Sequence, residues 1–475
     1  MVTARELTET TSKSMMKMVE EARDSHPYAV ADPIAREYAM GKFRPTAGPE
    51  IKAIIANGVT SEAPNVSENL TGQCLNEICA RLRFDYYDCE DVAVKEFLGT
   101  FATKNSFSKV MVQVNKRSKT DGNAALSVSW REGFGDREGR PILHHERWWD
   151  GHYGVFIEKS DDGTVEWAMT DFVDRDKVDR RTLFLPDRFL RFAKDGDGWK
   201  MLNGEPGSGR EGTVDNTRED GRPLGVPFAH FPNGAPAFGE YGKSTVKQVM
   251  ATQDALNASL MNRQLVVALT GMKIYTATGV AANDEMTVRP GQVWTTPNEN
   301  ARFADLEPGS IDELLKETED LRATICSEFP VPSYRLGNGD WPAGLALQRA
   351  DFPMIASAKL TGDVFDPAVV LIGHRVVELY NHYTDGDELD ESKLISVVWR
   401  PADEVDPGTQ VEIDQGRADL FTTAASLDEV FLRKLSILSD ADLKAFLARR
   451  KEQEELAAQA AEAEGIEDDQ NGPGA

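Results

Sequence analysis

Two long helical patterns that flank a short strand-rich segment limit this chain to few architectures. The first pattern begins at Ser244, which can cap a helix, and carries apolar residues at helical spacing as far as Gly271. Such a helix, of about 27 residues, spans about 40 Å. The second begins at Ser310, where Glu313 completes a capping box, and ends before Pro330. Between them we expect a small β module with strands at Lys273–Ala277, Gln292–Thr296 and Ala301–Leu306.

The segment after the second helix continues the helical character. Pro330 to Pro342 has the composition of a loop, and a single very long helix is predicted from Leu345 to Tyr383. Pro353, Gly362 and Pro367 interrupt its pattern, so we expect one bent helix. A strand at Leu394–Trp399 and helices from Ser426 onward complete the chain, which ends in an acidic tail that we expect to be disordered.

The N-terminal half mixes helices with antiparallel strands, which places the chain in the α+β class. Helices are predicted from Arg5 to Asp24, in a short second segment, over Asn65–Cys79 and over Val92–Asn105. Alternating segments predict strands at Val110–Val114, Ala125–Ser129 and Thr182–Leu185, and the apolar run Val226–Phe231 closes the region. A stretch rich in Gly, Asp, Glu and Arg, Asn203–Arg222, is predicted to be an exposed loop.

The charge balance and the cysteines exclude several classes of protein. Fifty-three basic and 79 acidic residues give a net charge of −26, which argues against tight binding of nucleic acid. No apolar run is long enough for a membrane span, and the N-terminus does not match a signal peptide. Four cysteines without a CxxC pair indicate buried thiols in a reducing compartment.

One segment is similar to a nucleotide-binding P-loop. Gly242-Lys243-Ser244 follows an apolar run and opens a helix, but Ala237 stands where the first glycine of a P-loop is needed to wrap the phosphates. A helix N-terminus capped by Ser244 or Thr245 is therefore the favoured interpretation, and an ATPase is the alternative.

Two further clusters are interpreted as structural. His144 and His145 are adjacent, so on a strand they point to opposite faces and cannot both meet His152 at one metal. The basic patch is expected to be a solvated strand face, with contact to a phosphate or to an acidic region of a neighbouring subunit as the alternative: Lys104, Lys109, Lys116, Arg117 and Lys119. We expect no catalytic residues, no metal and no cofactor.

Several stretches, in this order, resemble the portal proteins of tailed bacteriophages, of the siphophage type. They are Ala80–Phe84, Leu183–Arg188, Leu224–Phe231, Tyr241–Ser244 leading into Gln253–Asn257, and Pro330–Pro332 after a later helix. The likeness covers roughly residues 65–450 and rests on the order and spacing of the motifs.

The resemblance implies a mainly α portal fold that assembles into a ring of twelve. Its regions would be 1–240 for the N-terminal part and wing, 241–270 and 310–330 for the two stem helices, 271–309 for the clip, 331–343 for the tunnel loop, 344–384 for a kinked wing helix, 385–425 for a returning wing segment, and 426–475 for crown helices and the acidic tail. In the tunnel loop, Arg335 would touch DNA phosphate, with Tyr334, Asn338, Asp340 and Trp341 beside it. Clip residues that would dock a motor or an adaptor are Met286, Arg289, Trp294 and Arg302.

The portal resemblance also implies partners and a location. The ring would sit at one capsid vertex of the virion after synthesis in the host cytoplasm, and it would dock the terminase large subunit, then head-tail adaptor and capsid proteins, while double-stranded DNA passes without sequence specificity. The residues add a physical reason, because long helices with limited apolar stripes need copies of themselves for burial. Twelve copies would carry roughly −300 charges, which favours sliding of DNA over binding. Another minor capsid or scaffold protein is the remaining alternative.

Overall fold

The computed structural model describes residues 2–8, 12–26, 29–42, 67–133, 139–196, 198–204, 211–234, 241–271, 275–278, 300, 302–305, 312–336, 345–384 and 388–400. The chain divides into the units Met1–Ala402 and Asp403–Ala475, and every described residue belongs to the first. Helix and sheet are mixed, in agreement with the α+β prediction. The helices predicted from Ser426 and the acidic tail lie outside the described residues. None of the described helices combines the length and the apolar character that crossing a bilayer requires.

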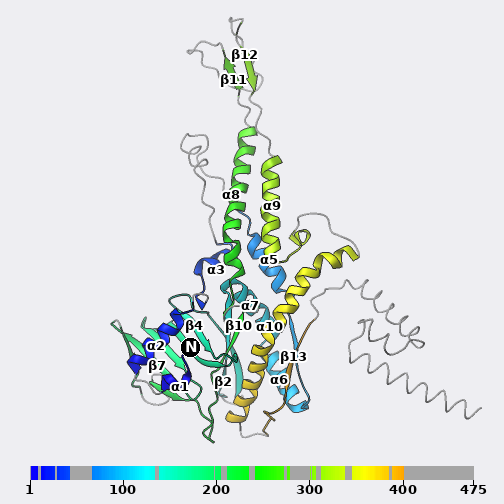
Figure 1. The fold of residues 1–475 in the computed structure, drawn as a ribbon. Helices are drawn as coiled ribbons and strands as arrows, with labels where there is room; N and C mark the ends of the chain where they lie inside the picture. Colours follow the sequence, from blue (N-terminus) through cyan, green and yellow to red (C-terminus); the bar gives the residue numbers. More distant parts are fainter. Residues whose placement is uncertain are drawn as a thin grey trace, which may run out of the picture. The chain divides into compact units, whose positions relative to one another are not determined.

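The largest sheet is antiparallel and has helices on one face (Figure 1). Its order is β4-β5-β6-β7-β8, with β9 also paired to β7: β4 (Gly154–Lys159), β5 (Val165–Val173), β6 (Asp179–Phe184), β7 (Arg188–Asp195), β8 (Gly198–Met201) and β9 (Thr213–Asp215). The covering helices are α1 (Ala4–Thr8) and α2 (Ser12–Asp24). Met16 and Val19 of α2 share an apolar core with Trp167, Met169 and Phe192 of the sheet. This core is closed by the chain itself.

A second layer consists of a three-stranded sheet, a separate pair of strands and three helices. Strands β2 (Asn123–Arg131), β3 (Arg140–Glu146) and β10 (Phe228–Pro232) form a three-stranded antiparallel sheet in the order β10-β2-β3. Strands β1 (Phe84–Cys89) and β13 (Ile395–Trp399) pair separately. Three helices share the apolar core of this layer: α6 (Val92–Lys104), α7 (Phe107–Asp121) and α10 (Leu345–Tyr383). Strand β2 is buried along most of its length, which explains its continuous apolar and small residues.

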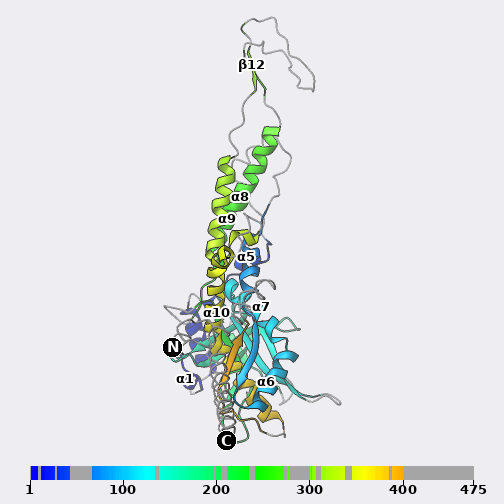
Figure 2. The same cartoon turned by 90° about the vertical axis from the view of Figure 1, so that its right-hand side faces the viewer.

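The two predicted long helices form an antiparallel pair, which we call the arm: α8 (Thr245–Gly271) and α9 (Asp312–Glu328). Figures 1 and 2 both show them side by side. Between them in sequence, β11 (Tyr275–Thr278) pairs with β12 (Arg302–Asp305), as predicted for two of the three strands. The third, Gln292–Thr296, lies outside the described residues. The start of α8 and the end of α9 pack against α3 (Pro33–Ala39) and α5 (Leu70–Cys79) in a third core.

Several sequence predictions need correction. Val110–Val114 is not a strand but part of α7, because Phe107, Met111 and Val114 recur at helical spacing and are buried together. Five residues that alternate by chance gave the wrong period. The stretch Asn203–Arg222 includes strand β9 and is not loop throughout, and Pro330–Pro342 includes a 3₁₀ helix at Ser333–Leu336. The helix predicted from Arg5 to Asp24 is described as α1 and α2, with residues 9–11 outside the described part.

The longest prediction is confirmed. Helix α10 runs from Leu345 to Tyr383 with Pro353 and Pro367 inside it, and Figure 1 shows that it changes direction along its length. A proline within a helix removes one backbone hydrogen bond and crowds the preceding turn, which accounts for a bend. All four cysteines are buried as free thiols, as predicted.

Candidate functional site

The root of the arm is held by a buried polar network. Gln253 of α8 is fully buried, and its Oε1 accepts hydrogen bonds from the Thr71 amide at 3.0 Å and from the Thr71 hydroxyl at 2.8 Å. Its Nε2 donates to the Glu68 carbonyl at 2.7 Å. Asn257, one turn further along, accepts from the Glu68 amide at 2.9 Å. Because these bonds join Gln253 and Asn257 to Glu68 and Thr71 at the start of α5, they fix the direction of α8.

The far end of the arm is much less covered. Beyond Met261, the described side chains of α8, which include Val266 and Val267, are half-buried or exposed. Val267 is 49% exposed, and Leu315 of α9 is 40% exposed. One buried contact between the helices is polar, where the hydroxyls of Ser259 and Thr318 lie 3.3 Å apart. Two described apolar side chains of the arm, Val267 and Leu315, are therefore partly open to solvent.

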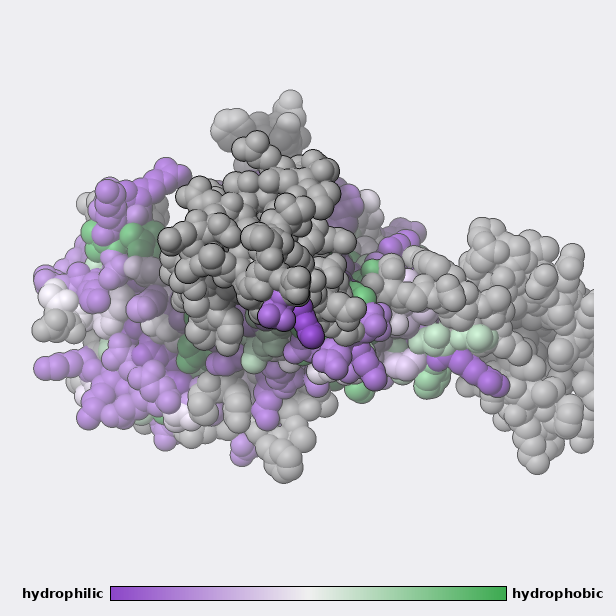
Figure 3. Space-filling model, turned by 90° about the horizontal axis from the view of Figure 1, so that it is seen from above, coloured by the Kyte–Doolittle hydropathy of each residue, from purple (hydrophilic) through white to green (hydrophobic). Residues whose placement is uncertain are grey.

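Helix α9 carries most of the arm's negative charge. It contains six acidic and two basic residues: Asp312, Glu313, Glu317, Glu319, Asp320 and Glu328 against Lys316 and Arg322. One of the two bases is neutralised, because Arg322 donates to Glu68 at 2.7 Å. Figure 3 shows that the coloured surface on the face seen from above is mainly hydrophilic. A duplex that passed along the exposed side of α9 would meet a net negative surface.

Tyr334 and Arg335, predicted to belong to a DNA-contacting loop, are brought together in the 3₁₀ helix after α9. Arg335 Nε donates to Asp351 of α10 at 2.8 Å, its second nitrogen bonds the other carboxylate oxygen, and the Tyr334 hydroxyl donates to the same carboxylate. Hydrogen bonding to Asp351 raises the pKa of Arg335, and burial, followed by the bond to Asp351, raises the pKa of Tyr334 to about 12. Burial opposes ionisation of Asp351, but the bonds from Arg335 and Tyr334 outweigh it and lower its pKa. The guanidinium that was expected to meet phosphate thus has a carboxylate of its own chain as partner.

Only some of the remaining predicted residues lie in the described part of the chain. Arg302 lies at the start of β12 and is exposed, and Glu313 lies exposed in the first turn of α9. Ser244 Oγ accepts from the Lys247 amide at 2.9 Å, which is the contact of a helix N-cap, and it donates to the Thr120 carbonyl at 2.6 Å. The other residues lie outside the described part of the chain: Asn338, Asp340, Trp341, Met286, Arg289, Trp294 and Ser310.

The turn that is similar to a P-loop is packed into the fold. The Gly242 amide donates to Asn123 Oδ1 at 2.9 Å, and the Lys243 carbonyl accepts from Asn233 Nδ2 at 2.6 Å. A Cβ at Gly242 would lie 2.3 Å from the Gly122 carbonyl oxygen, so the glycine serves the close approach of two backbones. In a P-loop the backbone amides face phosphate. Here the Gly242 amide faces Asn123, which favours the structural interpretation.

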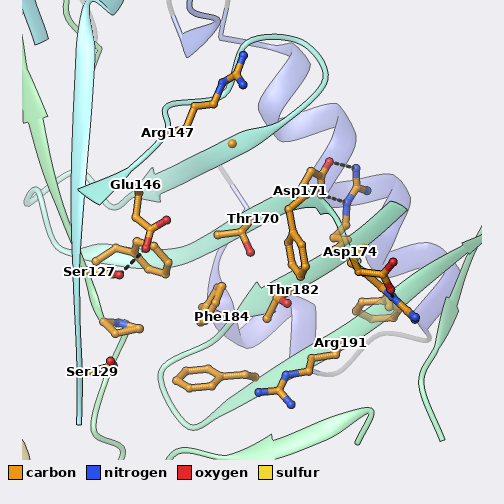
Figure 4. Close-up of a pocket in the computed structure, with 18 of the residues that line it drawn as sticks. Ser127, Ser129, Glu146, Arg147, Thr170, Asp171, Asp174, Thr182, Phe184 and Arg191 are labelled. Carbon is orange, nitrogen blue, oxygen red and sulfur yellow. Dashed lines mark hydrogen bonds and ion pairs between the residues drawn. The ribbon is translucent and has the colours of Figure 1, made fainter. Parts of the chain in front are cut away.

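A pocket of about 1200 Å³ lies between the six-stranded and the three-stranded sheet (Figure 4). The hydroxyls of Thr170 and Thr182 line it from paired positions of β5 and β6, and the Ser127 hydroxyl donates to Glu146 at 2.6 Å. Two of its arginines are paired with carboxylates, since Arg180 donates to Asp174 at 2.6 Å and Arg191 lies 3.4 Å from Glu211. The pocket therefore combines hydroxyls and aromatic rings with arginine–carboxylate pairs.

His144 and His145 lie on a strand, as predicted, whereas the basic cluster does not. His144 lies on β3 and contacts the Ser129 hydroxyl at 2.9 Å, and within the described residues no three His, Cys, Asp or Glu side chains gather as metal ligands would. The basic patch lies largely on helix α7 and not on a strand face. Lys119 of this patch is buried, which lowers its pKa. The expectation of a solvated strand face is therefore wrong.

Sequence analysis did not identify two residues that lie beside the predicted ones. Asp351 lies 16 residues after Arg335 on another helix, and Arg36 lies 80 residues before Lys116 yet faces the same surface pocket. A local pattern carries no signal for either pairing, because both depend on the packing of separate elements.

Comparisons with known proteins give structural likeness only. No protein-family model matches the chain, and no curated protein matches it. Among solved structures, a chain from the virion of a native gene transfer agent particle has 15% identity and a TM-score of 0.38, and covers 83% of this chain and 96% of that one. A chain from the neck of an empty particle, computed with C6 symmetry, has 15% identity, a TM-score of 0.40 and coverages of 88% and 98%. A chain from the neck of a native particle, computed with C12 symmetry, has 14% identity, a TM-score of 0.39 and coverages of 87% and 98%.

Proposed function

We propose that this chain is the subunit of a portal-type ring, a structural protein that forms a channel for DNA at one vertex of a phage-like capsid. In this proposal the arm of each subunit packs beside the arms of its neighbours around the channel. The β11–β12 module joins the two arm helices and would dock the packaging motor and later the adaptor proteins. The chain would act without catalysis of its own.

The observation that carries the proposal is the exposed apolar end of the arm. Val266 is half-buried and Val267 is 49% exposed on α8, and Leu315 is 40% exposed on α9. Exposing apolar side chains to water costs about 25 cal/mol for each Å² of apolar surface. A neighbouring copy of the same arm could remove that cost, and repetition of one such contact around an axis gives a closed ring.

The charge distribution supports a conduit better than a DNA-binding protein. The chain has a net charge of −26, and α9 contributes four of these charges, six acids less two bases. A polyanion inside a channel of like charge meets no strong local attraction, so it can move. In the described region, Arg335 is bound by Asp351 and is not displayed as an isolated cation.

Electron microscopy of the purified full chain tests the assembly. We expect closed rings with a central hole, and we expect Val267→Asp to abolish them, because a carboxylate would be buried at each contact between arms. Val92→Asp is the matched control, since Val92 is 67% exposed at the first position of α6 and an acid there suits the helix N-terminus. Circular dichroism checks that both variants remain folded.

Two results would contradict the proposal. A wild-type chain that remains monomeric at all attainable concentrations would exclude a self-assembling ring. Rings that form equally well with Val267→Asp would show that the exposed end of the arm is not the contact between subunits.

A further inference from the structure

Two lysines of α7 each contact an asparagine, but in different surroundings. Lys116 Nζ donates to Asn76 Oδ1 at 2.8 Å in a hydrogen bond that is exposed to solvent. Lys119 Nζ donates to Asn233 Oδ1 at 3.5 Å, and Lys119 is only 7% exposed. Both pairs bring an amine to a carboxamide on the same helix. The surroundings of each amine therefore decide what the pair can do chemically.

The amine of Lys119 lies where its neutral form is favoured. Water no longer solvates the ammonium group, and this burial lowers the pKa of Lys119. Within the described part of the chain, Lys119 forms no ion pair, and the ionisable group that acts on its charge is the buried Cys79 thiol. A neutral amine has a free electron pair, so a desolvated lysine is a nucleophile.

The carboxamide of Asn233 is held in place by the elements around it. Asn233 Nδ2 donates to the Lys243 carbonyl at 2.6 Å and to the Thr245 hydroxyl at 2.8 Å. The Asn233 backbone amide donates to the Gly122 carbonyl at 2.8 Å. These bonds leave the other end of the carboxamide, Oδ1, for Lys119. The fold thus brings an amine and a carbonyl group together in a fixed arrangement, which favours a reaction between them.

A small pocket of about 200 Å³ adjoins the pair. Lys119, Asn233 and Thr245 all line it. Glu328 and Leu360 also line it, and both are exposed, so the pocket opens to solvent. A small molecule released between Lys119 and Asn233 therefore has a route out of the fold.

We propose that Lys119 and Asn233 become joined covalently, by an amide bond between Lys119 Nζ and Asn233 Cγ. Nζ attacks Cγ, one proton of the amine passes to Nδ2, the bond between Cγ and Nδ2 breaks, and ammonia leaves. Thr245 Oγ1 lies 2.8 Å from Nδ2 and is placed to carry that proton. Nothing is oxidised or reduced, so the reaction needs no reactant besides the two side chains.

The bond would fasten elements that are far apart in the sequence. Asn233 directly follows β10, and 114 positions separate it from Lys119 on α7. Thr245 begins α8, so the bond would lie at the root of the arm. A crosslink that closes a long loop restricts the unfolded chain and thereby stabilises the folded one. The inference does not depend on the proposed ring, because both side chains belong to one folded chain.

The mass of the intact full chain tests the reaction. Folded wild-type protein, kept until its mass no longer changes, should be lighter than its sequence by about 17 Da, the mass of ammonia. Trypsin should not cleave after Lys119, because the enzyme requires a charged side chain there. Tandem mass spectrometry of the digest should find a branched peptide that contains both Lys119 and Asn233. On a denaturing gel under reducing conditions, the chain with the closed loop should migrate faster than a chain without it.

Matched variants assign the reaction to this pair. Lys119→Met should abolish the loss of mass, whereas Lys116→Met, which removes the amine of the exposed pair, should leave the loss complete. Asn233→Ser should also abolish it, because the carboxamide is gone. Thr245→Val should slow the appearance of the lighter chain by about 100-fold, since the proton relay is lost. Circular dichroism checks that each variant remains folded, and the wild-type mass alone can refute the proposal if a variant does not fold.

Three outcomes would overturn the proposal. The first is a wild-type chain whose mass stays at the value of its sequence. The second is a gain of about 1 Da at residue 233, which is deamidation by water at the Asn233-Gly234 sequence and would show that Lys119 is not the nucleophile. The third is a lighter chain whose branched peptide joins Lys116 to Asn76. Electron microscopy scores ring formation in separate samples, so failure of one proposal leaves the other standing.

Discussion

The six-stranded sheet and the arm differ in how far their apolar side chains are buried within one chain. In the sheet, apolar residues of β5 and β7 are covered by α2, and the charged residues within the layer have partners on neighbouring strands. In the arm, the root is built in the same manner, but Val267 of α8 and Leu315 of α9 are 49% and 40% exposed. If the proposed assembly is correct, the difference separates what one chain stabilises alone from what a second copy covers.

This contrast explains why charge has different meanings in the two regions. Arg181 is 3% exposed in the sheet and binds Asp171 through two nitrogens, at 2.7 and 2.8 Å, with Glu20 and the Trp199 ring as further partners. The acids of α9 are exposed to solvent and contribute to the charge of the surface. Buried charges must be paired, whereas surface charges set the field that a partner or a duplex meets.

The largest effect is expected from breaking the buried pair in the sheet. Arg181→Met leaves Asp171, which is 6% exposed, as a charge without a counter-charge, and should lower the free energy of unfolding by about 3–5 kcal/mol. Urea denaturation followed by tryptophan fluorescence measures the loss.

A matched arginine on the neighbouring strand provides the control. Arg188→Met removes a pair with Asp187 whose side chains are 44% and 34% exposed, and should cost at most about 1 kcal/mol. Equal losses for Arg181→Met and Arg188→Met would show that the sheet does not depend on its buried charges, and the contrast with the arm would lose its basis.

A smaller effect is expected at the root of the arm. Gln253→Leu keeps the approximate volume of the side chain but leaves the Thr71 amide and hydroxyl and the Glu68 carbonyl without their partner. The expected loss in the free energy of unfolding is about 2–3 kcal/mol. Hydrogen exchange of the amides in α5 should increase at the same time.

Gln248→Leu, an exposed position on the same helix, is the control for this change and should be close to neutral. If the two leucine variants unfold at the same urea concentration, the polar network does not hold the root, and the direction of α8 is set by apolar packing alone.

The sequence predicted the long elements well because their periodic signal extends over many turns. Helix α10 was found with both ends correct, since 39 residues of helical spacing outweigh two prolines, and α8 was found from a capping serine and its stripe. The prediction failed for Val110–Val114, where five residues are too few to distinguish a period of 2 from one of 3.6. Short strands such as β9 were missed for the same reason, because pairing with β7 supplies what the local sequence lacks.

The sites were less predictable than the fold. Arg335 was predicted to contact phosphate, but in the folded chain it binds Asp351, which belongs to a helix whose packing no local pattern encodes. The basic patch was noticed as a set of residues, yet only α7 shows which of its cations share a pocket and which, like Lys119, are buried. Charge is readable in a sequence, whereas the counter-charge depends on the tertiary structure.

The smallest effect is expected at the end of the arm, where two valines of α8 make a direct comparison. Val249 is 1% exposed at the root, so Val249→Ala removes buried methyl groups and should cost about 2 kcal/mol. Val267 is 49% exposed, and Val267→Ala should change the free energy of unfolding of the dissociated subunit by less than about 0.5 kcal/mol, because alanine's higher helix propensity offsets the little burial that is lost. Both are measured by urea denaturation at a dilution where assemblies dissociate. A cost of 2 kcal/mol at Val267 would mean that the single chain already buries this side chain, and Val267 would then need no neighbouring copy.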